Sequence, residues 1–120
     1  MGGKEKNTAF KFDVVDDVLV VDLKGPNITD PNLIDTLDKQ LAALPAQTDR
    51  KAFVIDLEHI DAMATRFINC LLVMLKSVRE EGGNLKFCNL QPDVERIFKL
   101  MRLHQVFDIY HSRDEAIASF

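Results

Sequence analysis

The stretch Ala52-Phe53-Val54-Ile55-Asp56-Leu57 restricts the fold of this chain more than any other feature. It is a nearly continuous apolar run, which is typical of a central strand covered on both faces. From Thr65 the pattern becomes helical, with an apolar face so wide that the helix should be largely buried. The pair Gly82-Gly83 ends that helix. A buried strand followed by a buried helix predicts an α/β fold.

Shorter runs on both sides continue the alternation of strands and helices. Two strands separated by Asp16-Asp17 predict a hairpin at the start. Each later strand–helix–strand crossover should be right-handed and give parallel neighbours. We therefore expect a mixed β-sheet with an N-terminal hairpin and about four packing helices, in the order β-β-α-β-α-β-α-β-α. The expected strands are Ala9–Val14, Val18–Leu23, Ala52–Leu57, Leu85–Leu90 and Val106–Tyr110, and the helices begin near Asp30-Pro31, Thr65, Pro92-Asp93 and Ser112.

The last helix carries its own start signal. Ser112 and Glu115 have the spacing of a capping box. The pattern then turns the side chains of Ala116, Ile117 and Phe120 inward. We expect this helix to close the domain.

The 120 residues suffice for one domain with its own core. Apolar residues make up 47% and charged residues 28%, which fits a globular domain and excludes a disordered tail or a disulfide-stapled miniprotein. We expect that domain to span residues 9–120. The polar residues 1–8 should form a mobile leader.

Charge and hydropathy restrict the classes of binding partner and the cellular compartment that we expect. A net charge of −4 leaves no basic stripe for direct nucleic-acid binding. No apolar run approaches the roughly 18 residues of a membrane span, so membrane insertion is not expected. The start of the chain lacks the apolar stretch of a signal peptide, and Cys70 and Cys88 form no CxxC pair. We expect a cytoplasmic protein with both cysteines buried as small hydrophobes.

The sequence lacks the usual patterns of catalysis. It contains no GxSxG elbow, no phosphate-binding loop and no GxGxxG. His59, His104 and His111 are not spaced as paired metal ligands. We expect no metal, no cofactor and no enzymatic activity.

One enzyme-like interpretation remains to be weighed. The acidic pocket of a phosphorelay receiver contains residue types that also occur here, at Asp16-Asp17, Asp56 and Lys86. Such a pocket needs the acidic pair at the end of a strand that leads into a helix, whereas this pair leads into another strand. We favour a solvated hairpin turn remote from Asp56. Asp56 and Glu58 could also act as paired carboxylates, but polar groups at a strand end explain them better.

One segment resembles the central segment of STAS domains. It follows the strand Phe53–Leu57 and reads His59-Ile60-Asp61-Ala62-Met63-Ala64-Thr65-Arg66-Phe67-Ile68-Asn69. This family includes the anti-sigma factor antagonists. Similar pieces extend from about residue 9 to residue 120. They are Leu23-Lys24-Gly25, Glu81-Gly82-Gly83-Asn84-Leu85, Leu100-Met101-Arg102-Leu103 before Val106–Tyr110, and Arg113-Asp114-Glu115-Ala116.

The resemblance implies a non-enzymatic switch. In well-known members, an anti-sigma factor with serine-kinase activity binds the antagonist and phosphorylates it at the start of the central helix. Thr65 occupies that acceptor position here. Orphan amides and the helix dipole favour an anion at such a place, and Arg66 could pair with a phosphate. The resemblance also implies a partner-binding surface, formed by Gly25, Asn27, Ile28, Thr29, Asp61, Met63, Ala64, Arg66 and Asn69.

Departures from the family pattern keep other interpretations open. Ala64 stands where aspartate is usual, and Arg66, Phe67 and Asn69 replace small residues, so their bulk could block a kinase. Thr65 could simply cap the helix, and the loop from Gly25 to Thr29 could be a plain turn. A STAS module without phosphorylation would suit a scaffold in a stress-sensing complex, or a cytoplasmic accessory of a membrane transporter. Self-association, or binding to other STAS proteins, is a further expectation.

Overall fold

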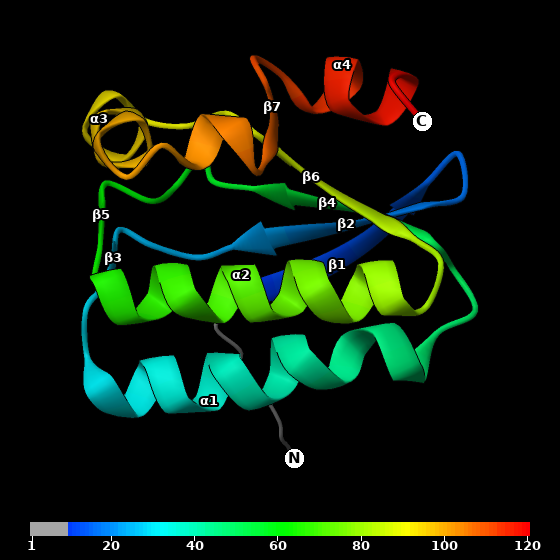
Figure 1. The fold of residues 1–120 in the computed structure, drawn as a ribbon, viewed down its shortest axis with the longest axis horizontal. Helices are drawn as coiled ribbons and strands as arrows, with labels where there is room; N and C mark the ends of the chain where they lie inside the picture. Colours follow the sequence, from blue (N-terminus) through cyan, green and yellow to red (C-terminus); the bar gives the residue numbers. More distant parts are fainter. Residues whose placement is uncertain (1–9) are drawn as a thin grey trace.

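The computed structural model describes residues 10–120, so the expected leader 1–8 and the first expected strand residue, Ala9, lie outside the described residues. The fold is a five-stranded mixed sheet with helices on both faces and a separate two-stranded sheet (Figure 1). The strands are β1 (Phe10–Val15), β2 (Val18–Leu23), β3 (Asn27–Ile28), β4 (Ala52–Asp56), β5 (Ala62–Met63), β6 (Asn84–Cys88) and β7 (Asp108–Tyr110). The helices are α1 (Pro31–Ala43), α2 (Thr65–Glu80), α3 (Pro92–Leu100) and α4 (Arg113–Ala118), with 3-10 helices η1 (Leu44–Gln47) and η2 (Leu103–Gln105).

The strand order in the large sheet is β1-β2-β4-β6-β7. The β1–β2 pair is antiparallel, and its turn residues Asp16 and Asp17 both have positive φ, of 52° and 67°, as the tight hairpin turns require. The remaining pairs are parallel and are joined through helices. The expected hairpin and mixed sheet are therefore confirmed.

One face of the sheet carries the main core. α1 and α2 lie side by side on it (Figure 1). Alternate residues of the central strands point into this layer, where Phe53 and Ile55 of β4 meet Phe67 of α2 in one buried cluster. Each such side chain contributes about 1.5–3 kcal/mol on burial, which explains why the run from residue 52 to residue 57 dominates the fold.

The other face is covered by α4. Ala116 packs there against Val20, Val54 and Cys88. The ammonium group of the buried residue Lys86 donates to the carbonyl and the hydroxyl of Ser119, at 3.1 Å and 2.8 Å.

The last helix starts as expected, but one inward prediction fails. The Ser112 hydroxyl accepts from the Glu115 amide at 3.1 Å, while the Glu115 carboxylate accepts from the His111 amide rather than from that of Ser112. Phe120 is 45% exposed, because its ring lies over the Lys86 ammonium, 4.3 Å from it, instead of entering the core.

Three strands are shorter than the sequence indicates. β4 ends at Asp56, one residue before the expected Leu57. β6 ends at Cys88 because Asn89 turns the chain with a φ of 58°. β7 begins only at Asp108. Phe107, expected in that strand, instead packs on the Phe87 ring at a centroid distance of 4.4 Å, after η2. No helix among residues 10–120 has the length and hydropathy that crossing a bilayer requires.

Candidate functional site

The small sheet joins two loops that are far apart in the sequence. β3 and β5 pair in parallel, with Asn27 opposite Ala62 and Ile28 opposite Met63. The Asp61 amide donates to the carbonyl of Pro26 at 2.7 Å. The loop after β2 and the loop before α2 thus form one surface element.

Gly25 permits this close approach. A Cβ atom at residue 25 would lie 1.8 Å from the backbone oxygen of His59. Any side chain there would force the two loops apart. The sequence resemblance identified this glycine, and the structure supplies the physical reason for it.

Helix α2 begins at this surface without a side-chain cap. Ala64 is the N-cap residue, with extended backbone, and its carbonyl accepts from the amides of Phe67 and Ile68 at 2.9 Å and 3.3 Å. Thr65 is the first helical residue and is exposed. No hydrogen bond within residues 10–120 uses its hydroxyl. The capping interpretation of Thr65 is therefore wrong, because the extended N-cap position belongs to the residue before it.

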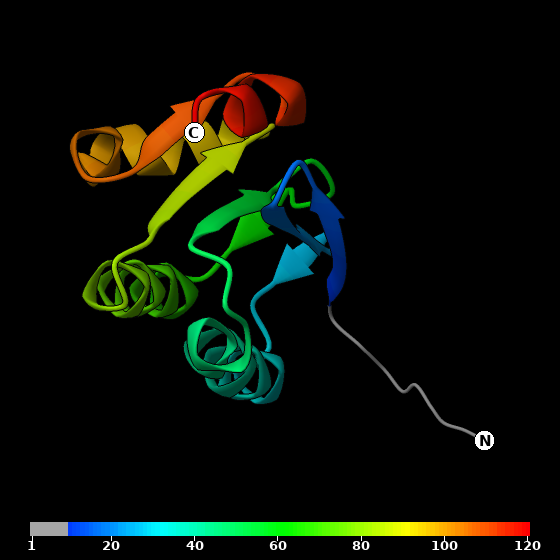
Figure 2. The ribbon, with the colours of Figure 1, turned by 90° about the vertical axis from the view of Figure 1, so that its right-hand side faces the viewer.

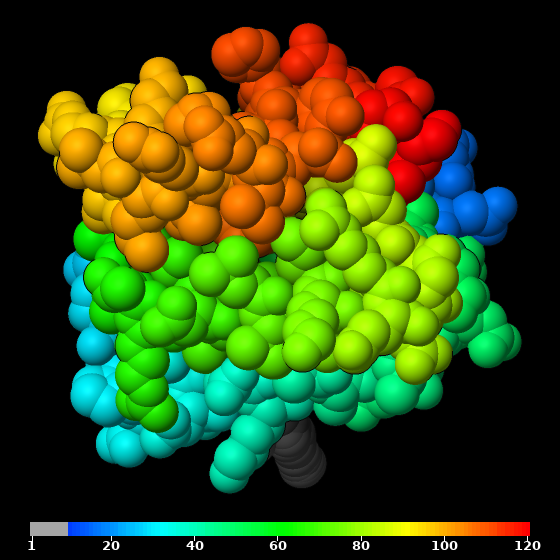
Figure 3. Space-filling view, in the orientation of Figure 1, coloured from blue at the N-terminus to red at the C-terminus, as the bar shows by residue number. Residues whose placement is uncertain are grey.

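The neighbours of Thr65 on the outer side of α2 are polar. Arg66 forms an ion pair with Asp35 of α1. Both side chains are about half exposed, at 56% and 52%, so the pair adds little stability and Arg66 can exchange partners. Asn69 is exposed one turn further along. Figure 1 places β3, β5 and the first turns of α1 and α2 on the same side of the molecule, and Figure 3 shows the start of α2 at the surface beside α1.

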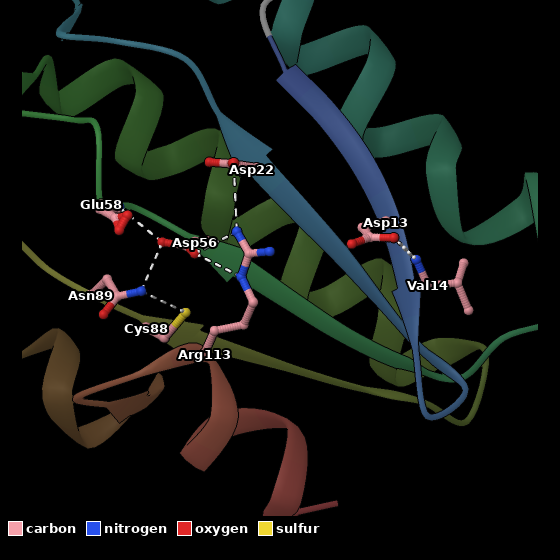
Figure 4. Close-up of polar contacts among 8 residues, drawn as sticks. All are labelled: Asp13, Val14, Asp22, Asp56, Glu58, Cys88, Asn89 and Arg113. Carbon is pink, nitrogen blue, oxygen red and sulfur yellow. Dashed lines mark hydrogen bonds and ion pairs between the residues drawn. The ribbon is translucent and has the colours of Figure 1, made fainter.

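A second polar cluster lies at the carboxyl ends of the central strands (Figure 4). The Asp56 side chain is buried, and its Oδ2 atom accepts from Nε of Arg113 at 2.9 Å. Its Oδ1 atom accepts from the Glu58 amide at 3.0 Å and from the side chain of Asn89 at 3.1 Å. Arg113 also approaches Asp22 at 3.5 Å.

This cluster is an internal ion pair rather than an open acidic pocket. Burial lowers the pKa of Arg113, but the hydrogen bond and the charge of Asp56 outweigh it, so the net pKa lies above its usual value. Both oxygens of Asp56 are engaged by the protein itself. Asp16 and Asp17 sit beside the start of β4, at the opposite end of that strand. The receiver interpretation thus lacks its geometry, and the described residues form no group of three or more potential metal ligands.

A model of the STAS domain family matches residues 9–116. The chain belongs to this family. The STAS domain is 28% identical, over 109 residues and 91% of each chain, to BtrV of Bordetella bronchiseptica, whose name places it among anti-sigma factor antagonists. Members of that class are regulatory proteins rather than enzymes.

Solved structures show the same fold. This STAS domain superimposes on an anti-sigma factor antagonist from Mycobacterium paratuberculosis with a TM-score of 0.79, at 24% identity over 92% of this chain and 91% of that one. SpoIIAA in its unphosphorylated form gives a TM-score of 0.75, at 18% identity over 91% and 93% of the two chains. Phosphorylated SpoIIAA of Bacillus gives 0.69, at 17% identity over 92% and 98%.

Only some of the residues that the sequence assigned to a partner-binding surface of this STAS domain are exposed. Ile28 and Met63 are 0% and 6% exposed, so their side chains hold the loops on the core. Phe67 is fully buried, so it adds no bulk that could block a kinase, contrary to the concern raised by its size. The exposed residues of the predicted set are Gly25, Asn27, Thr29, Asp61, Thr65, Arg66 and Asn69, with Ala64 half-buried among them.

Sequence reasoning missed the role of Arg113 in this STAS domain. Residues 22 and 56 are opposite each other on neighbouring strands, so two carboxylates lie close together at one end of the sheet and need a cation nearby. The sequence showed only that an acidic residue stands near the end of each of these two strands. It did not show which cation would reach them.

Proposed function

We propose that this chain is an anti-sigma factor antagonist that binds a serine-kinase-type anti-sigma factor of the same cell. Binding uses the surface formed by the exposed residues around β3, β5 and the start of α2. Phosphorylation of Thr65 releases the partner. The chain acts in the cytoplasm as a binding module and catalyses no reaction.

The position of Thr65 carries this proposal. Its side chain is exposed at the first residue of α2, and no hydrogen bond within residues 10–120 engages its hydroxyl. The oxygen is therefore available to a kinase without breaking the fold. The β3–β5 pair fixes both loops beside it through the Ala64 amide, which donates to the Ile28 carbonyl at 2.9 Å.

A phosphate at this place has a defined effect. It adds a charge of about −2 beside the amides at the start of α2, which carry partial positive charge. The helix can therefore accept the modification without refolding. The same charge inside a protein–protein contact must be desolvated, so the contact weakens.

The relatives support the same role. BtrV carries the name of an anti-sigma factor antagonist. SpoIIAA has been solved in both its unphosphorylated and its phosphorylated form, so a STAS fold of this kind accommodates a phosphoryl group.

The test uses native extract and three baits. Wild-type chain should capture a kinase-type anti-sigma factor, identified by mass spectrometry, and Thr65→Glu should lose it. Thr36→Glu is the matched control, because Thr36 is an exposed threonine inside α1, and this bait should still capture the partner. Incubation of the captured kinase with ATP should then add one phosphate to the wild type and none to Thr65→Ala.

One observation favours a second candidate. Arg66 is a large exposed residue directly after the acceptor, which suits a STAS scaffold or transporter accessory that no kinase modifies. That function predicts identical captured proteins for wild type and Thr65→Glu, with no phosphate on Thr65. This result would reject the phosphorylation switch.

A further inference from the structure

Strand β1 ends the sheet with an apolar, unpartnered edge. Among residues 10–120, no strand pairs with its outer side, and Figure 2 shows β1 at the rim of the molecule. Phe12 and Val14 are 53% and 47% exposed on this strand. Open edges with exposed apolar residues are templates for another strand.

The backbone of this edge is set for pairing. In a two-residue hairpin, the residues flanking the turn are hydrogen-bonded, and bonded and non-bonded pairs alternate from there. Since Val15 and Val18 flank the turn, the amides and carbonyls of Phe10, Phe12 and Val14 point away from β2. The Val14 amide supports this, because its only partner among the described residues is the carboxylate of the adjacent Asp13, at 3.0 Å (Figure 4).

The side chains of β1 are complementary to themselves in one antiparallel register. If Phe12 faces Phe12 of a second copy, Lys11 faces Asp13 of that copy and Asp13 faces its Lys11. Phe10 then faces Val14. Opposite charges and apolar pairs directly across strands stabilise an antiparallel pair, and in this register every facing pair within residues 10–14 is favourable.

The hydrogen-bond pattern is compatible with this register, and the facing of Lys11 and Asp13 distinguishes it from registers shifted by two residues. Residues 10, 12 and 14 carry the outward-facing backbone groups, and they are the residues that face one another when Phe12 lies at the centre. The resulting interface is isologous, as two-fold symmetric dimers require. Charged residues usually keep an edge strand unpaired, but here Lys11 of each copy lies opposite Asp13 of the other, so the charges attract.

We propose that two copies of this chain pair antiparallel through β1, with Phe12 on the two-fold axis, to form one continuous ten-stranded sheet. The number follows from two five-stranded sheets joined edge to edge. None of the exposed residues around Thr65 belongs to β1. The partner-binding surface and the pairing edge therefore use different segments of the chain.

Charge reversal at the edge provides the test. Lys11→Glu places two acidic side chains in each facing pair, and Asp13→Lys places two basic ones. Sedimentation equilibrium should show a concentration-dependent dimer for the wild type, with a dissociation constant raised about ten-fold in either variant. Both residues are exposed, and circular dichroism should show each variant folded.

Mixing the two variants is the decisive step. In a heterodimer, the introduced glutamate of one chain faces the introduced lysine of the other, and the retained Asp13 faces the retained Lys11. Both pairs are attractive again, so the mixture should recover the wild-type dissociation constant. A mixture that associates no better than its components would overturn the proposed register, and a wild type that stays monomeric up to millimolar concentration would overturn the dimer.

Cross-linking reads the register directly. Phe12→Cys places two thiols across a hydrogen-bonded pair, where Cα atoms are about 5.5 Å apart and a disulfide can form. Val14→Cys is the matched control, because its two copies would lie about 14 Å apart along the strands. Mild oxidation should cross-link only the first variant, since Cys70 and Cys88 are buried. Equal cross-linking of both variants would contradict pairing centred on Phe12.

The N-terminal residues offer a different occupant for the edge. A chain lacking residues 1–8 should dimerise as the full chain does. If only the shortened chain dimerises, the N-terminal segment covers β1 in the full protein, and that outcome also overturns the proposal.

Discussion

The guanidinium of Arg113 lies 2.8 Å from Oδ2 of Asp56, although the two residues are 57 positions apart in the chain. Asp56 belongs to the central strand β4 and its side chain is 2% exposed, whereas Arg113 opens α4. The pair therefore fixes the last helix to the sheet. Removing Arg113 leaves the buried Asp56 carboxylate without a cation, whereas removing Asp56 leaves Arg113 only its longer contact with Asp22, at 3.5 Å.

Replacement of Arg113 by alanine should lower the free energy of unfolding by about 3 kcal/mol. The loss is large because an unpaired buried carboxylate remains at Asp56. Urea denaturation of Arg113→Ala against the wild type measures it. Limited proteolysis should also show earlier cleavage after residue 112, because α4 loses its attachment.

Arg96 provides the matched control for this loss. It forms an exposed pair with Asp93 at 3.2 Å, so Arg96→Ala should cost less than about 1 kcal/mol. The double variant Arg113→Ala with Asp56→Asn should lose less stability than the two single variants lose together, since neither member of the buried pair then carries a charge. Equal losses for Arg113→Ala and Arg96→Ala would show that the buried pair stabilises the fold no more than an exposed pair does.

Substitution of Gly25 by alanine should disturb the β3–β5 pair. The added Cβ atom would lie 1.8 Å from the His59 oxygen, so the loops must separate at a cost of about 1–3 kcal/mol. Hydrogen exchange should accelerate at the amides of Asp61 and Ala64. If the chain binds an anti-sigma factor as proposed, that binding should weaken as well.

Gly82→Ala separates this effect from a general loss of stability. Gly82 has a φ of +83° and no atom within 4 Å of an added Cβ, so alanine costs about 1 kcal/mol through backbone strain alone. Exchange at the Asp61 and Ala64 amides should stay as in the wild type. If it accelerates equally, the β3–β5 pair responds to global stability rather than to the contact at Gly25.

Hydrophobic periodicity predicted the large elements well. The run Val18–Leu23 became β2 with the expected bounds, and α2 begins at Thr65 as expected. Both carry long apolar patterns whose burial dominates local preferences. β3 and β5 hold two residues each, which is too short for any period to show.

Side-chain partnerships were less accessible to sequence reasoning. The alternative that Thr65 caps the helix was wrong by one residue, because a helix start is defined by backbone angles that a sequence does not display. The partner of Asp56 comes from a distant helix. The family resemblance predicted a partner-binding surface around Thr65, yet only the structure separated the exposed Asn27 from the buried Ile28.

Replacement of Ala64 by aspartate should stabilise the chain by about 1 kcal/mol. Ala64 is an N-cap residue with extended backbone, at φ −74° and ψ 150°, and lacks a capping side chain, whereas an aspartate there accepts from the first helical amides. Thermal or urea denaturation measures the gain. Thr65→Ala should change stability by less than about 0.5 kcal/mol, and a loss above about 1 kcal/mol would show that the Thr65 hydroxyl caps the helix after all.

The two cysteines should make stability fall at alkaline pH. Burial, followed by the nearby Asp56 carboxylate, raises the pKa of Cys88 from 9.0 to about 12. Burial, followed by Asp38, raises that of Cys70 to about 11. Between pH 9 and these values the folded chain holds thiol protons that the unfolded chain has lost. The contribution of these thiols to the free energy of unfolding is therefore complete below pH 9 and disappears as the pH rises through 11 and 12.

Urea denaturation from pH 8 to pH 11 measures this dependence. Cys88→Ala should flatten the decline relative to the wild type, whatever its effect on stability at pH 8, and Cys70→Ala should flatten it less. A thiol reagent at pH 8 should label neither cysteine in the folded chain and both in urea, because the buried thiols are protonated and inaccessible. Rapid labelling of Cys88 without urea, or identical pH slopes for wild type and Cys88→Ala, would contradict a buried neutral thiol beside Asp56.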